Sequence, residues 1–338
     1  MRFPEFSGEW DSERLENLTV SIGDGLHSTP VYCEQGDYCF INGNNIIDGK
    51  VSINEKTLRV TKEEAYKYNA ALLKVDTILM SINGTIGNVA LYNGENIMLG
   101  KSACYINPSS RIVREYLFHI LSSPRIQAYF QGEVTGTTIK NLSLRTIRGS
   151  KILLPSNEEQ KKIARLFSLV DERIATQNKI IEDLKKLKSA ISERLFKSVK
   201  GSTVLLSDLC DIVKGKQING ENLSDSGNYY VMNGGTEPSG YYDNYNVEAS
   251  TISISEGGNS CGYVQFNTSP FWSGGHCYSI QNIADKVDNM YLYHYLKSNE
   301  DAIMKLRIGS GLPNIQKKDL AMFKIIVPTI DKQIEIST

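Results

Sequence analysis

A regular pattern of apolar residues runs through the middle of the chain, from residue 156 to residue 200. Apolar side chains recur there at multiples of seven residues, with Gln177 in the central place of the series. This spacing predicts a helix whose apolar stripe packs against another helix. We expect the partner-helix interface to comprise Ile163, Phe167, Val170, Ile174, Gln177, Ile181, Leu184, Leu187, Ile191 and Leu195.

Local signals indicate where this helix begins and ends. Ser156 follows Pro155 and is followed three residues later by Glu159, which is the pattern of a capping box, and Gly201 is the expected stop. About 43 residues at roughly 1.5 Å each make a rod of about 65 Å, which we expect to separate the domains it joins. Gln177 either fixes the register against a partner helix or is partly exposed, and both interpretations stay open.

The segments on either side of the helix contain short apolar or alternating runs separated by Gly, Asn and Ser. Such runs, among them DTILMSI, ACYI, TISIS and CYSI, predict short strands. Each segment also contains a helical pattern, YLFHILSS in the first and YLYHYLKS in the second, so His119 and His294 are expected to be packing or capping residues and not ligands. The sequence therefore predicts an α+β protein.

The chain repeats itself at an offset of 173 residues. KILLPSNEEQKKI at 151–163 returns as KIIVPTIDKQIEI at 324–336. The same offset joins Gly136 with Gly309, Asn141 with Asn314, and Cys104-Tyr105 with Cys277-Tyr278. A repeat of this length is the size of a folded domain, so we expect two similar domains, 1–155 and 201–328, separated by the long coiled-coil-type helix at 156–200. Residues 329–338 are expected to start a second helix of the same kind.

Composition excludes several classes of protein. The chain has 338 residues, 41% of them hydrophobic, and a net charge of −1, which is typical of a globular protein with ordinary cores. No apolar run reaches the length of a membrane span, and the start MRFPEFSGEW lacks the pattern of an export signal. Six cysteines without a C-x-x-C pair favour reduced thiols. We expect a cytoplasmic protein without a metal or cofactor and without a membrane partner, although a zinc site built from distant residues stays open.

Basic residues gather in particular stretches. Residues 157–200 hold 11 basic and 7 acidic side chains, and each repeat has a late basic cluster, around Lys140 and Arg145 in the first and around Lys317 and Lys318 in the second. These clusters are either solvated faces or contacts for nucleic-acid phosphates. Because residues 217–285 contain no Lys or Arg, phosphate contacts of the second domain would come from Lys214, Lys216 and the late cluster.

Several loops combine glycine with side chains that donate and accept hydrogen bonds. They occupy residues 24–30, 81–88, 230–244 and 256–262, and they are either readers of base edges in a DNA groove or ordinary turns. The candidate DNA-binding residues are Asp24, Gly25, His27, Ser28, Thr29, Asn83, Thr85, Lys140, Asn141, Arg145, Lys214, Lys216, Asn233, Gly234, Asn314, Lys317 and Lys318.

Signatures of catalysis are incomplete. GENIMLGKS at 94–102 has five residues between its glycines where a phosphate-binding loop has four, so we interpret it as a turn and a strand. The sequence contains no H-E-x-x-H, and NPSS at 107–110 lacks the second proline and the aromatic residue of a methyltransferase motif. We expect a protein that is not an enzyme.

The chain resembles the specificity subunit of type I restriction-modification systems. The resemblance rests on RFPEFSGEW, DGLHSTP, INGNNIIDG and SINGTIGN in the first half, on the central run from LPSNEEQKKI to AISERLF, and on VMNGGTEPSGYYD, ISEGGNSCG and FWSGGHCYSI in the second half. It implies two target recognition domains, each reading one half of a split double-stranded DNA sequence. A rod of about 65 Å spans nearly two turns of B-DNA, in agreement with two separate half-sites.

The resemblance also implies partners. Methyltransferase subunits dock on the long helices, restriction subunits join the complex, and S-adenosylmethionine, ATP and Mg belong to those partners. Members of the family extend further at both ends and have a second long helix, which here is about ten residues long. We therefore hypothesise an alternative or silent allele, a frameshifted product or a trimmed form, whose exposed stripe supports self-association. The alternative function is that of an assembly protein for helix pairing, or of an inactive allele with degenerate recognition domains.

Overall fold

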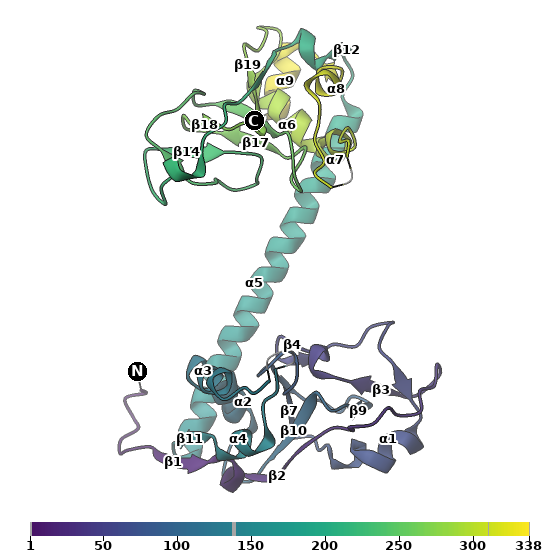
Figure 1. The fold of residues 1–338 in the computed structure, drawn as a ribbon, viewed down its shortest axis with the longest axis vertical. Coiled ribbons are helices and arrows are strands. Elements are labelled where there is room, and N and C mark those ends of the chain that lie inside the picture. Colours follow the sequence, from purple (N-terminus) through teal and green to yellow (C-terminus); the bar gives the residue numbers. More distant parts are fainter. Residues whose placement is uncertain (1, 137–139, 310, 338) are drawn as a thin grey trace. The chain divides into compact units, whose positions relative to one another are not determined.

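The computed structural model describes residues 2–136, 140–309 and 311–337, so Thr338, the last residue of the expected second helix, lies outside it. Two compact units divide the chain, unit 1 over Met1–Asn178 and unit 2 over Lys179–Thr338 (Figure 1). Within the described residues, no helix combines the length and the apolar character that a membrane span requires.

Unit 1 is built on a four-stranded antiparallel sheet in the order β2-β10-β7-β8. Its strands are short and largely apolar because helices cover them, with Tyr116, Leu117 and Phe130 among the buried helix residues of the core. The elements are β2 (Thr19–Asp24), β7 (Ile78–Ser81), β8 (Val89–Leu91), β10 (Ala103–Pro108), α2 (Arg114–Ser122), α3 (Pro124–Gly132) and α4 (Leu144–Gly149).

Smaller sheets complete unit 1. In one of them β3 runs parallel to β9 and antiparallel to β6, and α1 lies beside it (Figure 1). A second pairs β1 with β11, and a third pairs β4 with β5. The elements are β1 (Asp11–Arg14), β3 (Tyr38–Ile41), β4 (Ile46–Ile47), β5 (Lys50–Val51), β6 (Arg59–Val60), α1 (Lys62–Tyr68), β9 (Ile97–Leu99) and β11 (Lys151–Leu154).

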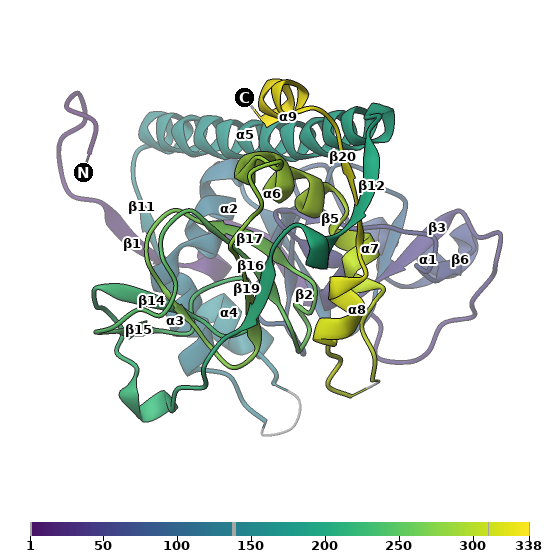
Figure 2. The same cartoon turned by 90° about the horizontal axis from the view of Figure 1, so that it is seen from above.

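Unit 2 repeats this plan. Its main sheet has the order β13-β19-β16-β17, β14 runs parallel to β18 in the smaller sheet, and β12 pairs with β20. Helices α6 and α9 lie side by side (Figures 1 and 2). The elements are β12 (Ser202–Leu205), β13 (Asp211–Lys214), β14 (Tyr229–Met232), β15 (Tyr241–Tyr242), β16 (Thr251–Ser255), β17 (Val264–Asn267), β18 (Trp272–Ser273), β19 (Cys277–Gln281), α6 (Asn289–Ser298), α7 (Glu300–Met304), α8 (Lys317–Ala321), β20 (Lys324–Val327) and α9 (Ile330–Ser337).

The sequence repeat corresponds to a repeated set of buried hydrogen bonds. The side-chain oxygen of Gln160 accepts from the backbone N–H of Val113 at 2.8 Å, and that of Gln333 accepts from the N–H of Asp288 at 2.8 Å. Each glutamine also donates to the carbonyl of the proline five residues earlier, at 3.0 Å and 2.9 Å. Because these amides satisfy buried backbone groups, both copies of the motif keep the glutamine.

One equivalence predicted from the sequence is wrong by one residue. Ala103 and Cys277 occupy the same place, since the first pairs with Ser81 and the second with Ser255, and each accepts a hydrogen bond from the glycine that follows its neighbouring strand. Cys104 therefore corresponds to Tyr278, at an offset of 174. The preceding loops differ in length, and a shift of one residue moves a strand side chain to the other face of the sheet.

Helix α5 (Asn157–Ser198, 42 residues) occupies the expected range. Ser156 caps it by accepting from the backbone N–H of Glu159 at 3.3 Å. The Glu159 carboxylate does not complete a capping box, because it receives the Arg2 guanidinium at 2.7 Å and the Trp10 indole N–H at 3.2 Å.

The two histidines of the helical patterns are packing residues, as expected. The His119 ring lies 5.3 Å from the Phe167 ring, and the His294 ring lies 4.9 Å from the Tyr293 ring. Burial lowers the pKa of both imidazoles.

Candidate nucleic-acid interface

In unit 1 several loops meet at one end of the main sheet. This loop end of unit 1 consists of residues 24–30, 42–45, 81–88, 100–102 and 140–145. Asn83 donates its amide to the carbonyl of Lys101 at 2.9 Å, and the N–H of Gly84 donates to the carbonyl of Lys140 at 3.1 Å. The predicted loops 24–30 and 81–88 and the first basic cluster thus share one surface.

Gly25 holds this end together through its backbone. A Cβ atom at Gly25 would lie 2.3 Å from the carbonyl oxygens of Leu99 and Gly100, so only glycine fits. Gly215 of unit 2 has the same place, 2.2 Å from the carbonyl oxygen of Gly274. Gly25 therefore packs against backbone, and any side chain that this loop presents to a ligand comes from its neighbours.

The neighbours of Gly25 present polar groups to solvent. The imidazole of His27 lies 2.6 Å from the Asp24 carboxylate, and 71% of the His27 side chain is exposed. Ser28 and Thr29 are exposed as well. This loop offers both hydrogen-bond acceptors and donors.

The other candidates of unit 1 divide into exposed side chains and framework. Thr85, Lys140 and Arg145 are exposed. Asn141 acts through its backbone, which exchanges hydrogen bonds with Thr135 at 2.8 and 3.0 Å. Asn141 therefore positions the loop that carries Lys140.

Sequence reasoning missed Asn42 and Gly43. The Asn42 side-chain oxygen accepts from the Ser102 hydroxyl at 2.8 Å, and the same hydroxyl accepts from the N–H of Gly43 at 2.8 Å. These bonds tie the smaller sheet to the loop end. The signal was present, since an Asn-Gly pair also occurs at 233–234 in the second half.

The loop end of unit 2 has the same construction and consists of residues 214–219, 233–240, 256–262, 273–276, 308–309 and 311–318. The Asn233 side chain accepts from the N–H of His276 at 3.2 Å, and the carbonyl of Gly234, at φ +88, accepts from the Ser255 hydroxyl at 2.6 Å. Asn314 bridges Gly257 through its backbone, in the manner of Asn141.

A buried carboxylate distinguishes the loop end of unit 2. Glu256 has a side chain only 11% exposed and lies 2.5 Å from the Lys214 ammonium and 3.6 Å from the His276 imidazole. Burial, followed by the charge of Glu256, raises the pKa of the Tyr278 phenol. Glu256 begins the predicted loop 256–262, but the contact of Glu256 and His276 with Lys214 was not predicted, because only the fold brings these residues together.

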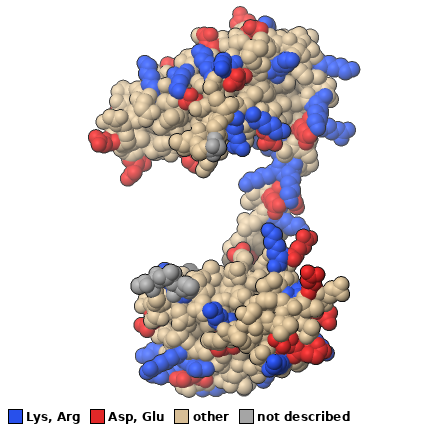
Figure 3. Space-filling view, turned by 45° about the vertical axis from the view of Figure 1, so that its right-hand side comes forward, with Lys and Arg blue, Asp and Glu red and all other residues tan. Residues whose placement is uncertain are grey.

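The predicted phosphate contacts of unit 2 are exposed. Lys216, Lys317 and Lys318 belong to this loop end, and all three face solvent. Figure 3 shows further Lys and Arg side chains gathered along α5. Cations of this kind neutralise phosphates without reading sequence.

The predicted partner-helix stripe is exposed apart from its first residue. Ile163 is partly buried and packs on the core of unit 1. Gln177 is exposed, so its amide can form hydrogen bonds with water when no partner helix is bound. The exposed apolar residues of the stripe are Phe167, Val170, Ile174, Ile181, Leu184, Leu187, Ile191 and Leu195.

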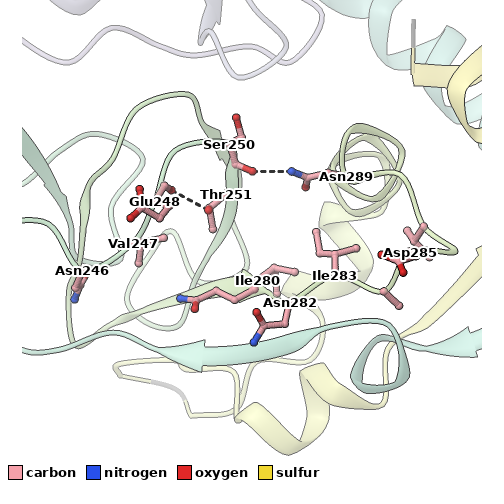
Figure 4. Close-up of a pocket in the computed structure, with 13 residues that line it drawn as sticks. Asn246, Val247, Glu248, Ser250, Thr251, Ile280, Asn282, Ile283, Asp285 and Asn289 are labelled. Atoms are coloured by element: carbon pink, nitrogen blue, oxygen red, sulfur yellow. Dashed lines mark hydrogen bonds between the residues drawn. The ribbon is translucent and has the colours of Figure 1, made fainter.

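A cavity of about 510 Å³ lies in unit 2 at the other end of the main sheet, between the start of β16 and the end of β19 (Figure 4). Asn289 donates there to the carbonyl of Ser250 at 2.6 Å. The described residues that line it include Glu248 and Asp285 and no Lys or Arg. This lining does not suit a phosphate, and the cavity is separate from the loop end.

Both halves of the chain match known proteins. A family model described as the type I restriction modification DNA specificity domain matches residues 8–186 and again residues 200–338. The type I restriction enzyme MjaVIII specificity subunit of Methanocaldococcus jannaschii is 24% identical over 98% of this chain and 85% of that protein. The Escherichia coli type I restriction enzyme EcoBI specificity subunit is 27% identical over 45% of this chain and 33% of that protein.

A solved structure has the same fold. The crystal structure of the type I restriction-modification system S subunit from M. genitalium has a TM-score of 0.67 at 21% identity, covering 100% of this chain and 90% of that one. The family model matches the chain twice, and units 1 and 2 share one arrangement of sheets and helices, which we call the frame. The chain therefore belongs to the type I restriction-modification DNA specificity family.

Proposed function

We propose that this protein is the DNA-recognition subunit of a type I restriction-modification complex, in which each unit reads one half of a split target. The observation that carries the proposal is that units 1 and 2 have the same frame, while the polar side chains at their two loop ends differ. A constant frame with variable loops suits two readers of two different sequences.

The subunit binds DNA and leaves the chemistry to its partners. Methyltransferase subunits dock on the exposed apolar stripe of α5 and restriction subunits join the complex. S-adenosylmethionine, ATP and Mg are bound by those partners, and the complex works in the cytoplasm, where its DNA is.

Base reading and phosphate binding are divided among the residues of each loop end. Asp24, His27, Thr85 and Asn233 have groups that match base edges. Lys140, Arg145, Lys216, Lys317 and Lys318 supply the sequence-independent attraction to phosphates.

A methylation map tests the proposal. The full chain is expressed with its methyltransferase subunit in a host without adenine methylation, and modified adenines are mapped across the genome. We expect one motif with two specified halves and an unspecified gap, and no modification when either protein is expressed alone.

Two results would overturn the proposal. If coexpression modifies DNA without a sequence motif, the units do not read DNA and the protein serves assembly. If the chain modifies DNA by itself, it is an enzyme. The stripe is tested in parallel, because Leu184→Glu should abolish copurification of the methyltransferase subunit, whereas Lys186→Glu on the same helix should not.

A further inference from the structure

The buried carboxylate of unit 2 occupies a place that is apolar in unit 1. Glu256 and Ile82 correspond, because each donates its backbone N–H to the carbonyl of the residue just before a matching strand of the main sheet. That residue is His276 before β19 in unit 2 and Ser102 before β10 in unit 1. Ile82 is 3% exposed and Glu256 is 8% exposed. The frame thus holds either a hydrocarbon or a charge here.

A charge at this place is not needed for folding. In unit 1, Ile82 and Cys104 fill it and belong to the main core. Burying a carboxylate is costly unless it is paired and hydrogen-bonded, and apolar replacements of such pairs are often neutral or stabilising. Apolar side chains, as in unit 1, would therefore stabilise this place without a buried charge. The presence of Glu256 in unit 2 is better explained by a function than by stability.

Three side chains, of Lys214, His276 and Tyr278, direct polar groups at the Glu256 carboxylate. Lys214 at the end of β13 lies 2.5 Å from one carboxylate oxygen. The Tyr278 hydroxyl of β19 shares its one hydrogen between that oxygen, at 3.3 Å, and the backbone carbonyl of Ile315, at 3.0 Å. His276 approaches the second oxygen at 3.6 Å. These contacts fix the carboxylate, and the carboxylate fixes Lys214.

Lys214 keeps donors for a ligand. An ammonium group has three N–H donors, the pair with Glu256 uses one, and 53% of the Lys214 side chain is exposed. Because the pair is neutral overall, it adds little to the attraction of phosphates. What it adds is a donor with a fixed direction, and fixed direction is what reading a base edge requires.

We propose that Lys214 is a specificity-determining residue that donates to the guanine acceptors O6 and N7 in the half-site of unit 2, and that Glu256 is its positioning residue. The inference rests on the proposed function and names the base class that one residue reads. Lysine to guanine is among the commonest specific contacts in the major groove.

Unit 1 provides an internal control. Asp24 corresponds to Lys214, since each ends the strand before the conserved glycine, Gly25 or Gly215. An acceptor thus stands where unit 2 has a donor. Changes at Lys214 should leave the half-site of unit 1 untouched.

The test compares methylation motifs of the full chain coexpressed with its methyltransferase subunit. For Lys214→Ala we expect one guanine in one half to become unspecified, with its preference falling roughly 5- to 150-fold, and the other half unchanged. Lys214→Arg should keep the guanine, because arginine donates to the same acceptors. Glu256→Gln should weaken the preference at the same position, because it leaves Lys214 unfixed.

Two further variants keep the test decisive. Lys214→Ala with Glu256→Ile copies the apolar solution of unit 1, so the unit folds without an unpaired carboxylate and should lose the same guanine. Lys216→Ala is the matched control and should lower methylation evenly without changing the motif.

The outcomes separate the two proposals. An even loss at all positions in the Lys214 variants would make Lys214 a phosphate contact, and a change in both halves would make it a structural residue, so either result overturns the inference. If the unaltered chain yields no motif, the proposed function itself fails.

Discussion

Units 1 and 2 share a frame and differ in the chemistry at its loop end. Both have a glycine packed against backbone and an Asn-Gly pair hydrogen-bonded to the turn before β10 or β19. Both also have an asparagine whose backbone bridges to the loop beside the basic cluster. On this frame unit 1 carries Asp24 paired with His27, whereas unit 2 carries Lys214 paired with buried Glu256. The conserved contacts are mostly made by backbone, and the differing ones by side chains, so the loop chemistry can change without loss of the fold.

The starts of helices α5 and α9 also share hydrogen bonds made by a glutamine and differ in neighbouring side chains. Gln160 of α5 and Gln333 of α9 make matching bonds. Glu159 is buried under Arg2 and Trp10, while its counterpart Lys332 is exposed and pairs with Glu335 at 2.8 Å. The amino-terminal segment thus adds a contact that belongs to unit 1 alone.

The largest effects are expected from adding a side chain at the glycine that packs against backbone in each unit. Gly25→Ala and Gly215→Ala should each destabilise their own unit by about 3 kcal/mol, because the added Cβ meets backbone that cannot move aside. The chain has one tryptophan in each unit, Trp10 and Trp272, so denaturant unfolding of Trp272→Phe and Trp10→Phe backgrounds reports each unit separately.

Controls for the glycine variants lie in open space. Gly132→Ala and Gly220→Ala have no atom within 4 Å of the new Cβ and should change stability little. An equal loss in control and test variants, or tolerance of Gly215→Ala alone, would break the equivalence of the two loop ends.

The paired glutamines should give the next largest effect. Gln160→Ala and Gln333→Ala each leave buried backbone groups without partners, which costs about 2 kcal/mol. The same tryptophan-resolved unfolding measures both. The exposed Gln35→Ala is the control and should be neutral, and markedly unequal losses at 160 and 333 would show that the two helix starts are not equivalent.

The Arg2 contact should make unit 1 respond to pH where unit 2 does not. Hydrogen bonding from Arg2 lowers the pKa of Glu159 below its ordinary value. A depressed folded-state pKa stabilises above the unfolded value of about 4.3, and this contribution disappears as pH falls through the folded pKa. Arg2→Ala should therefore destabilise unit 1 at pH 7, with the difference from the unaltered chain vanishing in acid.

Lys332→Ala is the matched control for this pH effect, since exposed ion pairs contribute little to stability. It should leave unit 2 unchanged throughout the titration. A pH-independent loss in Arg2→Ala would mean that packing, and not the charge of Glu159, holds the amino-terminal segment.

The smallest effects should come from the late basic clusters, and they should be alike in both units. Arg145→Ala and Lys318→Ala should each reduce the slope of log binding constant against log salt by about 1 without changing the motif. Binding of the assembled complex to its target duplex is measured across salt concentrations. Lys286→Ala, beyond the other end of the main sheet, should keep the full slope.

Features that depend on residues close together in the sequence could be predicted, and contacts between distant residues could not. The limits of α5 came within two residues of expectation, because heptad spacing and a serine cap are local signals. The composition of loops 24–30 and 81–88 indicated candidate DNA-binding residues, but it could not show that Gly25 is packed against the backbone of Leu99 and Gly100. The contacts of Glu256 with Lys214 and His276 could not be predicted, because they join residues far apart in the chain.

The repeat shows where sequence comparison reaches its limit. Gln160 and Gln333 aligned correctly because the segments between proline and glutamine have equal length. Cys104-Tyr105 aligned with Cys277-Tyr278 by identity, but strand pairing places them one residue apart. Residue identity does not carry register, which hydrogen bonding between strands sets.

The sequence by itself determined the α+β class, the tandem repeat, the central helix with its apolar stripe and the family resemblance, because these depend on periodicity, capping and repetition along the chain. Only the tertiary structure decided which polar residues meet at the loop ends and that equivalent places hold Ile82 in one unit and Glu256 in the other. Such encounters depend on strand register and loop closure, which bring together side chains that no local pattern connects.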